Sequence, residues 1–506
     1  MKKDVIIIGA GVSGLSTAIK LAMNQPKINI VVLAKKHFDA CNTSRAQGGI
    51  AAVMDKMNDN FQRHLDDTLE SGGGLCNKRI AQLFVKESPK RIIELDEWGV
   101  EFTKDKKGDF LLNLEGGHSA NRIVHAQDKT GQILLEGLIN KAKSFSNIEI
   151  LLHHFVTNIV LNENKECIGV KVVNLTENKL YAIFAKVIVL GSGGSGQVFE
   201  NTTNPKEATG DGIVLANRIG AKISNMRFLQ FHPTALYEPH NNPKFLISEA
   251  VRGYGAHIVN HKMQRFLFKH DVRGELATRD ILTKAIFDEM KNENQDFVFL
   301  DLRHLVIEDF KQKFPTIFSY LAFSDYNIAK NLIPIIPAAH YQCGGIDTDV
   351  WGHTSIEGLF AVGECANNGL QGSNRLASNS LAESLVFADF IAQGILNKIK
   401  EKQMPVVEFE KKTLHNTQKT DSELTVMSQS LKRMMSKIIS ANTSKDEFQL
   451  ASMLCLKIKH LTEEYTSFDL NREEIKNLAE VSEIIIADKI SHSSFETEAN
   501  NNHQLV

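Results

Sequence analysis

The first 23 residues form a strand–turn–helix pattern that strongly limits the folds open to this chain. Residues 5–8 are a short apolar run typical of a buried parallel strand, GAGVSG occupies residues 9–14, and residues 15–23 have helical spacing. In a G-x-G-x-x-G turn the glycines permit a tight bend, a close approach of a pyrophosphate to the backbone, and close packing of helix on strand. We therefore expect an α/β domain that opens with a β-α-β unit and binds a dinucleotide. The alternative is a glycine-rich turn without a ligand.

The second expected strand, residues 28–33, does not end in the acidic residue that usually binds the ribose of NAD. Ala34 and Lys35 follow it instead, which argues against an ordinary NAD site. A lysine here could reach a phosphate, or the chain could hold the adenosine end by its backbone.

Three later stretches look like remote parts of the same site. They are GSGGSG at 191–196, TGDGI at 209–213 and FAVGE at 360–364. A strand that ends in Gly-Glu can place a carboxylate against a polyol chain. Together the stretches fit one extended ligand and a chain that leaves the nucleotide domain and returns to it.

The length of 506 residues suggests about three domains at roughly 150 residues each. Strands are expected at 148–161, 166–173, 186–190 and 358–362, and helices at 80–98, 275–290 and 378–400. From about residue 411 glycine is absent and leucine and methionine recur at helical spacing. We expect a nucleotide domain of two segments, 1–225 and 342–410, a capping domain at 226–341, and a C-terminal helical domain at 411–506 with a disordered tail from residue 491.

Composition favours a cytoplasmic protein with free thiols. The formal net charge is −2, which indicates neither a nucleic acid nor a membrane as partner. The six cysteines contain no CxxC pair, so we expect no metal site. The N-terminal lysines and apolar run could pass for a signal peptide, but glycines interrupt the run, and no stretch reaches the ~18 apolar residues that a spanning helix needs.

Several distant segments combine cationic side chains with hydrogen-bond donors. FHPTALY carries His232, RGELATRD carries Arg273 and Arg279, PAAHYQCGG carries His340, GSNRLASNSL carries Arg375, and EGGHSANR carries Glu115, His118 and Arg122. Two arginines and two histidines that converge would suit a small dianion, because guanidinium groups bind carboxylates in a bidentate manner. Taken singly, such an arginine is usually a surface ion pair and such a histidine is usually structural.

On these motifs the chain, over roughly residues 4–400, resembles the fumarate reductase/succinate dehydrogenase flavoprotein superfamily, and within it the L-aspartate oxidase family. AQGGIAAV, EGGHS, TTNP, GDGI, QFHPTALY, RGELATRD, PAAHYQCGG and NRLASNSL carry the likeness. The resemblance implies an α/β FAD-binding Rossmann-like domain with an inserted, mobile α+β capping domain and a C-terminal helical domain. By the same resemblance, the residues that bind FAD are Ala10, Gly11, Val12, Ser13, Lys35, Asn42, Thr43, Ser44, Arg45, Ala46, Gln47, Gly48, Gly49, Val156, Asp211, Glu364, Ser380 and Leu381.

The loop at residues 42–49 is implied to run beside the flavin ring. Membrane-complex relatives join a histidine of this loop covalently to the flavin, whereas Asn42 stands here. Asparagine cannot form that bond, so we expect non-covalent FAD.

For the substrate, the resemblance implies that the two carboxylates are bound by His232, Ser248, His340 and Arg375, together with Arg279. Arg279 stands at the proton-donor position of the family, with Glu249 and Arg252 as the relay behind it. Because arginine is a poor base, we expect a mainly electrostatic role for Arg279 in aspartate oxidation. Glu115 is expected to attract the substrate ammonium and so to favour aspartate over succinate.

The implied reaction moves a hydride from Cα of L-aspartate to the flavin and releases iminoaspartate, which feeds quinolinate and NAD synthesis. The electrons pass to O2, giving H2O2, or to fumarate, giving succinate, and functional coupling to quinolinate synthase is possible. Gln371, Thr278 and the segment LKRMMSKIISAN depart from the family pattern. The alternatives are a soluble fumarate reductase or succinate dehydrogenase flavoprotein subunit, and a non-catalytic FAD-binding protein.

Overall fold

The computed structural model describes residues 2–405, 407, 409–414, 422–439, 443–465 and 467–502. At its centre lies a sheet whose parallel strands have the order β6-β2-β1-β9, and β16 pairs with the far side of β9. These strands are β1 (Lys2–Ile8), β2 (Ile30–Leu33), β6 (Ile148–Leu151), β9 (Lys179–Leu190) and β16 (Leu359–Ala361). Ile8 pairs with both Leu33 and Leu190. The carboxyl ends of three strands therefore meet where the glycine turn begins.

The fully apolar run of β1 is explained by burial on both faces of the sheet. Val5 and Ile7 belong to a core made with helices on one side, and Ile6 and Ile8 belong to a second core on the other side. Successive side chains of a strand point to opposite faces, so a strand covered on both sides has no polar positions. The helices packed on the first face are α1 (Val12–Asn24), α3 (Lys78–Glu97), α4 (Thr130–Lys143) and α10 (Asn379–Glu401).

Antiparallel strands pair with the first half of β9, or with each other, and so enlarge the central sheet. They are β7 (His154–Leu161), β8 (Cys167–Asn174) and β18 (Lys412–Thr413). Two small sheets flank the centre. One is formed by β3 (Ile50–Ala51), β4 (Leu112–Asn113) and β5 (Ile123–Val124), and the other by β10 (Ile223–Ser224), β15 (Gly345–Asp347) and β17 (Ala366–Asn367). The helices α2 (Phe61–Ser71) and α5 (Asp211–Arg218) complete this part.

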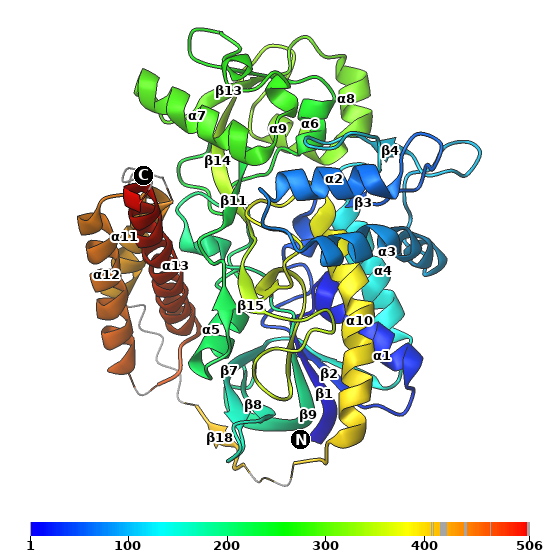
Figure 1. Ribbon diagram of the computed structural model, residues 1–506, viewed down its shortest axis with the longest axis vertical. Coiled ribbons are helices and arrows are strands. Elements are labelled where there is room, and N and C mark those ends of the chain that lie inside the picture. Colours follow the sequence, from blue (N-terminus) through cyan, green and yellow to red (C-terminus); the bar gives the residue numbers. More distant parts are fainter. Residues whose placement is uncertain are drawn as a thin grey trace.

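A second unit, in the upper part of Figure 1, stands on two long strands. Its antiparallel sheet has the order β11-β14-β13-β12, with β11 (Leu229–Leu236), β14 (Ile333–Gln342), β13 (Val298–Asp301) and β12 (His257–Val259). Its helices are α6 (Glu249–Gly253), α7 (Arg279–Glu293), α8 (Ile307–Lys313) and α9 (Pro315–Phe323). The unit has its own apolar core, which draws on residues from 236 to 335. This core lies within the expected capping segment, and the unit is called the cap below.

The last three helices, α11 (Ser422–Ile438), α12 (Lys445–Glu463) and α13 (Leu470–Asn502), pack together on one side of the molecule. They do not form a core of their own. Leu431, Cys455 and Ile485 belong to the same buried cluster as Ile6 and Val31 of the central sheet. The expected C-terminal segment is thus helical but continuous with the nucleotide domain. Residues 415–421, 440–442, 466 and 503–506 of that segment lie outside the described residues.

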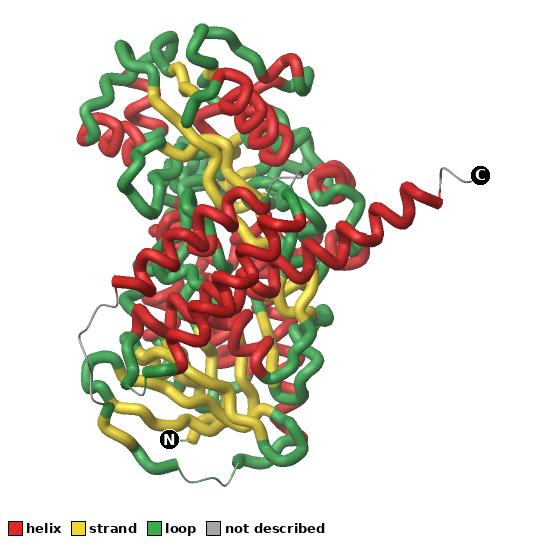
Figure 2. The backbone as a smooth tube through the Cα atoms, turned by 90° about the vertical axis from the view of Figure 1, so that its left-hand side faces the viewer, coloured by secondary structure: helices red, strands yellow, loops and turns green. Residues whose placement is uncertain are grey.

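One local expectation from sequence was wrong, and one segment differs in form. From residue 491, where a disordered tail was expected, α13 continues as far as Asn502, and Figure 2 shows these last turns projecting from the body. The sequence there has neither glycine nor proline to end a helix. The helix expected from residue 275 begins at Arg279, because residues 274–276 form a 3₁₀ turn and the Glu275 carboxylate instead accepts bonds from Arg265 and from the Ile258 N–H.

No helix in the described part of the chain is long and apolar enough to cross a membrane. All six cysteines are free thiols.

Candidate functional site

One cavity, at the carboxyl ends of β1, β2 and β9 and reaching under the cap, gathers almost every residue that the sequence pointed to. Of the residues that the resemblance assigned to FAD, substrate or the proton relay, Arg252 alone does not line it. From the nucleotide domain the lining includes Ala10, Gly11, Val12, Ser13, Lys35, Asn42, Thr43, Ser44, Arg45, Ala46, Gln47, Gly48, Gly49, Glu115, Val156, Asp211, Glu364, Arg375, Ser380 and Leu381. From the cap and its two supporting strands it includes His232, Ser248, Glu249, Arg279 and His340.

The glycine turn forms one end of the cavity in the way the motif predicts. Gly9 has φ +114°, and a Cβ there would lie 2.1 Å from the Gly191 carbonyl oxygen, so only glycine fits. Helix α1 starts after Gly11 without a side-chain cap and without an acidic residue in its first turn. Its partial positive charge therefore faces the cavity uncompensated, which fits a pyrophosphate.

Lys35 lies at the adenosine end, but its ammonium group is already occupied. The Nζ atom donates to the Glu207 carbonyl oxygen (3.0 Å), Thr209 Oγ1 (3.0 Å) and Asp211 Oδ2 (2.8 Å), and pairs with Glu474 Oε1 (2.6 Å). An ammonium has three N–H groups, so four acceptors leave none for a ligand. Of the two alternatives for this residue, the geometry favours the one in which the backbone faces the ligand.

The loop at residues 42–49 is held in place by contacts from three sides. Asn42 Nδ2 donates to Glu364 Oε2 (2.9 Å), the Gly131 N–H donates to the Ala46 carbonyl (2.8 Å), and the Gly49 N–H donates to Ser378 Oγ (3.2 Å). Burial raises the pKa of Glu364. The buried Gln47 Oε1 atom has no partner among the described residues. A loop of fixed backbone with an unpaired acceptor fits a ring system with polar edges such as a flavin.

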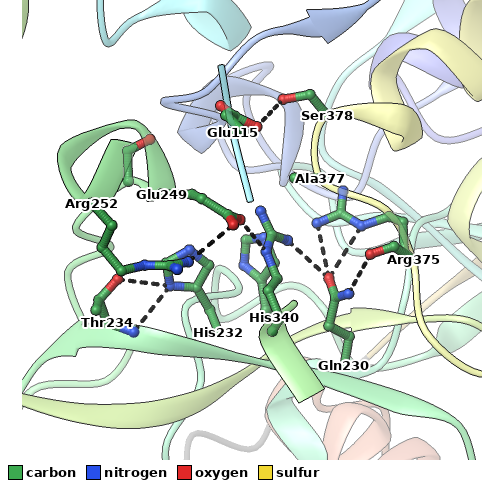
Figure 3. Close-up of polar contacts among 12 residues, drawn as sticks. Glu115, Gln230, His232, Thr234, Glu249, Arg252, His340, Arg375, Ala377 and Ser378 are labelled. Atoms are coloured by element: carbon green, nitrogen blue, oxygen red, sulfur yellow. Dashed lines mark hydrogen bonds and ion pairs between the residues drawn. The ribbon is translucent and has the colours of Figure 1, made fainter. Parts of the chain in front are cut away.

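Beyond this loop, four basic side chains from distant segments converge under the cap, as Figure 3 shows for three of them. His232 comes from β11, Arg279 from the start of α7, His340 from β14, and Arg375 from the loop before α10. The His232 and His340 rings lie 5.1 Å apart. The convergence that residue spacing could not prove is therefore present in the fold.

Gln230 links the two arginines, and the sequence reasoning did not single it out. Its Oε1 atom accepts from Arg279 Nη1 (2.8 Å) and from Arg375 Nε and Nη2 (3.3 and 3.2 Å). Its Nε2 atom donates to Asn374 Oδ1 and to the Arg375 carbonyl, both at 2.6 Å. Gln230 stands two residues before His232 on the same strand, and so on the same face. Strand periodicity could have found it.

The two histidines are neutral near pH 7, so the arginines supply the positive charge. Burial, followed by the neighbouring Arg279, holds the pKa of His232 and of His340 well below the usual range. The Thr234 N–H donates to His232 Nδ1 (3.3 Å), which places the His232 proton on Nε2. Burial lowers the pKa of Arg375 to about 10, which still leaves this residue charged. Two guanidinium groups with two neutral imidazoles can bind a dicarboxylate.

Arg279 is backed by a buried ion-pair chain. Its Nε donates to Glu249 Oε2 (2.7 Å), and Arg252 Nη2 lies 3.2 Å from the other oxygen of Glu249. Burial disfavours the charged form of Glu249, but Arg252 and Arg279 outweigh it and lower its pKa. Arg252 thus lies behind Glu249, outside the cavity, as the expected relay requires. Ser248 caps α6 by accepting from the Ala250 N–H (3.3 Å).

Glu115 faces the cavity from the nucleotide domain and is bonded to Ser378, another residue that sequence reasoning missed. Ser378 Oγ donates to Glu115 Oε2 (2.6 Å). Ser378 has φ +59°, an uncommon conformation for serine, and no sequence signal marked it. Burial, then the nearby Glu249, raises the pKa of Glu115.

His118 and Arg122 of the same motif lie behind Glu115 rather than in the cavity. Arg122 is fully buried and pairs with Asp59 (Nε–Oδ2, 2.8 Å) and Asp67, and its Nη1 donates to His118 Nδ1 (3.0 Å). His118 Nε2 then donates to the Ala377 carbonyl (2.9 Å). The network fixes the segment that carries Ser378.

The third arginine of the sequence motifs, Arg273, takes no part. It lies at the surface, paired with Asp271 at 3.0 Å. No group of three or more potential metal ligands occurs in the described ranges.

Comparisons with known proteins place the chain among FAD-binding relatives. Residues 4–381 match the family described as an FAD binding domain. L-aspartate oxidase 1 of Ralstonia nicotianae is 38% identical over 505 residues, covering 97% of this chain and 93% of that protein. L-aspartate oxidase of Pseudomonas aeruginosa is 38% identical, covering 96% and 92% of the two chains.

Among solved structures, a quinol fumarate reductase of E. coli aligns with a TM-score of 0.88 at 28% identity, covering 96% of this chain and 88% of that one. This chain is therefore similar in sequence to L-aspartate oxidases and similar in fold to a fumarate reductase.

Proposed function

The chain belongs to the L-aspartate oxidase family of FAD-binding fumarate reductase/succinate dehydrogenase flavoproteins, and from this premise we propose how its cavity oxidises L-aspartate. The observation that carries the proposal is the arrangement of Arg279 and Arg375 around Gln230, with the carboxyl group of Glu115 facing the same cavity. FAD, when bound, would supply a two-electron acceptor for the hydride from Cα of L-aspartate, with O2 (giving H2O2) or fumarate (giving succinate) as the final electron acceptor.

The two guanidinium groups hold the two carboxylates of the substrate. Arg375 Nη1 also donates to Ser380 at the start of α10, and its guanidinium lies 4.4 Å from the centre of the Tyr341 ring. His232, His340 and Ser248 supply neutral hydrogen bonds to the same carboxylates. A dianion in a water-poor cavity then sees two positive charges at fixed positions, which favours binding of the dicarboxylate over a monoacid.

Glu115 selects the amino acid. The substrate must lose an ammonium proton before a hydride can leave Cα, and Glu115 is the carboxyl group placed to attract that ammonium. Because burial raises the pKa of Glu115, it is a better proton acceptor than an exposed glutamate. Succinate has no amino group and gains nothing from Glu115.

When fumarate is the electron acceptor, Arg279 gives it a proton and regains one through Glu249 and Arg252. The hydrogen bond of Arg279 to Glu249 and the ion pair of Glu249 with Arg252 support this order. During aspartate oxidation Arg279 stays charged and acts electrostatically.

We propose that FAD is held without a covalent bond. Asn42 stands at the position expected for the linking histidine and donates its amide to Glu364, and an amide is no nucleophile. Acid precipitation should leave the flavin in the supernatant, whereas flavin that stays with the pellet contradicts the proposal. The choice of O2 or fumarate, coupling to quinolinate synthase and a cytoplasmic location stay predictions.

The first test mixes the FAD-loaded protein with L-aspartate or succinate without oxygen. L-aspartate should bleach the oxidised flavin band rapidly and succinate should not. Glu115→Gln keeps the shape and removes the charge, so it should slow bleaching by L-aspartate by about 100-fold, within the range for loss of one proton-transfer group. Reoxidation of the reduced variant by fumarate should stay near wild type.

A soluble fumarate reductase or succinate dehydrogenase subunit is the second candidate, favoured by the structural similarity to quinol fumarate reductase. Absence of bleaching by L-aspartate, with rapid reoxidation of chemically reduced flavin by fumarate, would establish that candidate. A non-catalytic FAD-binding protein would show neither reaction.

A further inference from the structure

The last helix of the chain reaches back to the adenosine end of the cavity. Glu474, in the first turns of α13, pairs with Lys35 at 2.6 Å. One turn later, Asn477 Nδ2 donates to Asp211 Oδ1 (2.9 Å). Lys35 and Asp211 both line the cavity, whereas Glu474 and Asn477 do not. Two residues of α13 therefore hold two residues of the cavity wall from behind.

The four side chains are joined in one series that runs from Glu474 through Lys35 and Asp211 to Asn477. Lys35 donates to Asp211 Oδ2 (2.8 Å), and Thr209 Oγ1 donates to Asp211 Oδ1 (2.7 Å). The side chains of Lys35, Asp211 and Glu474 are each at most 16% exposed. Although burial opposes it, the two carboxylates raise the pKa of Lys35. A lysine between two carboxylates keeps its charge and stays away from the ligand, and Asp211 begins helix α5 at the cavity wall.

Close packing brings α13 to this point. Gly210, with φ +73°, precedes Asp211, and a Cβ on it would lie 2.6 Å from Val481 Cγ2. The helix thus packs directly on the turn that starts α5, and any shift of α13 moves that turn.

Another ion pair of α13, that of Asp488 with Arg227, involves no residue of the cavity wall and offers a matched control. Asp488 accepts from the backbone N–H of Arg227 (2.9 Å) and from its Nη1 (3.1 Å). Both side chains of that pair are 17% exposed, similar to the Glu474 pair. Neither Arg227 nor Asp488 lines the cavity.

We propose that Glu474 and Asn477 are positioning residues for FAD. They hold the Lys35 ammonium group and the start of α5 in the arrangement that leaves the backbone at the end of β2 free to receive the adenosine half. The inference rests on the adenosine half of FAD lying beside Lys35 and Asp211, which both line this end of the cavity. The C-terminal helical segment is then part of the cofactor site and not only a packing element.

The test compares Glu474→Gln with Asp488→Asn in the full chain, freed of flavin. The dissociation constant of FAD is measured by flavin fluorescence, and that of ADP, which represents the adenosine half, by competition. Glu474→Gln should weaken both by about ten-fold, since one partner of a buried pair is lost while Asp211 remains. Asp488→Asn should leave both dissociation constants within about two-fold of wild type, the scatter expected for a remote substitution. It should nevertheless lower the unfolding temperature of the apoprotein about as much as Glu474→Gln does.

At saturating FAD, the KM for L-aspartate and kcat of Glu474→Gln should equal those of wild type. Asn477→Leu is the second variant, to be used if Glu474→Gln folds poorly. It should also raise the dissociation constant of ADP. Unchanged ADP affinity in both variants, or equal loss in Asp488→Asn, overturns the inference. Failure of the aspartate oxidation proposal would appear separately, as wild-type holoprotein that L-aspartate does not bleach.

Discussion

At the scale of the residue, one side-chain amide sets the geometry of both site arginines. Gln230 Oε1 accepts from Arg279 of the cap and from Arg375 of the nucleotide domain. Two guanidinium groups that bind the same oxygen atom lie close enough to repel each other. The shared neutral acceptor holds them without cancelling their charge. Because the acceptor is neutral, the site keeps the positive charge that binds a dianion.

Gln230→Glu tests this charge argument. A carboxylate between the arginines would neutralise them, so the dissociation constant of succinate should rise by about 100-fold, equivalent to about 2.7 kcal/mol. Gln230→Met removes the acceptor but adds no charge, and should weaken succinate by less. The measurement is the change of the flavin spectrum on succinate addition. Equal effects of the two variants would mean that hydrogen bonding, and not charge, decides.

The motifs indicate the residue types of the site, but not which of those residues meet in the fold. The sequence favoured Arg279 and Arg273 equally by spacing, and only the 3₁₀ turn before α7 sends one inward and the other to the surface. Ser378 gave no signal because its role comes from a left-handed backbone that serine rarely adopts. Lys35 stood out at the end of the second strand, yet its partner Glu474 lies more than 400 residues away.

At the scale of the element, the segment before α10 is held by a histidine from another part of the chain. His118 Nε2 donates to the Ala377 carbonyl while Nδ1 accepts from Arg122. Both contacts need the neutral ring in a single tautomer. Burial, then Arg122, lowers the pKa of His118 from 6.5 to about 4.

His118→Gln should reveal a pH-dependent contribution to stability. The folded pKa of His118 lies below the unfolded value, so folding disfavours the proton. The contribution is therefore complete above pH 6.5 and is lost as the pH falls toward about 4. The wild type should unfold at a higher temperature than His118→Gln at pH 7.5, and the difference should shrink at pH 5. The exposed His270→Gln serves as control, and a difference that is constant with pH contradicts the assignment.

Helix and strand identities followed from periodicity, whereas their ends followed from contacts that periodicity does not contain. The run at residues 5–8 predicted a doubly covered strand, which the two cores on either side of β1 explain. The start of α7 was missed, because the Glu275 side chain is bonded to Arg265 and the helix begins only at Arg279.

At the scale of the whole molecule, the cap has an apolar core of its own, while the C-terminal helices share the core of the nucleotide domain. Asp128 of the nucleotide domain joins the two units at the rim of the cavity. Its Oδ2 atom accepts from the Thr316 and Ile317 N–H groups (2.8 and 2.9 Å) at the start of α9. A carboxylate from one unit thus caps a helix of the other.

Asp128→Ala should loosen the cap by about 1–2 kcal/mol, the usual cost of losing a helix cap. Amide hydrogen exchange in α9 should speed up, while exchange in β1 stays unchanged. Asp309→Asn, an exposed acid at the start of α8, should alter neither. Equal acceleration in β1 would mean that the whole fold, and not the joint between the units, had weakened.

The contact between Lys35 and Glu474 also has a consequence for the order in which the protein is made. Lys35 leaves the ribosome early and Glu474 leaves it when little of the chain remains. Of the two strands next to β1, β9 is also made later, since it starts at Lys179. In a nascent chain the glycine turn is therefore made long before the residues that complete the adenosine end of the cavity. If α13 has the proposed role, FAD should bind at full affinity only after α13 is made, and a chain cut short before α13 should bind FAD more weakly.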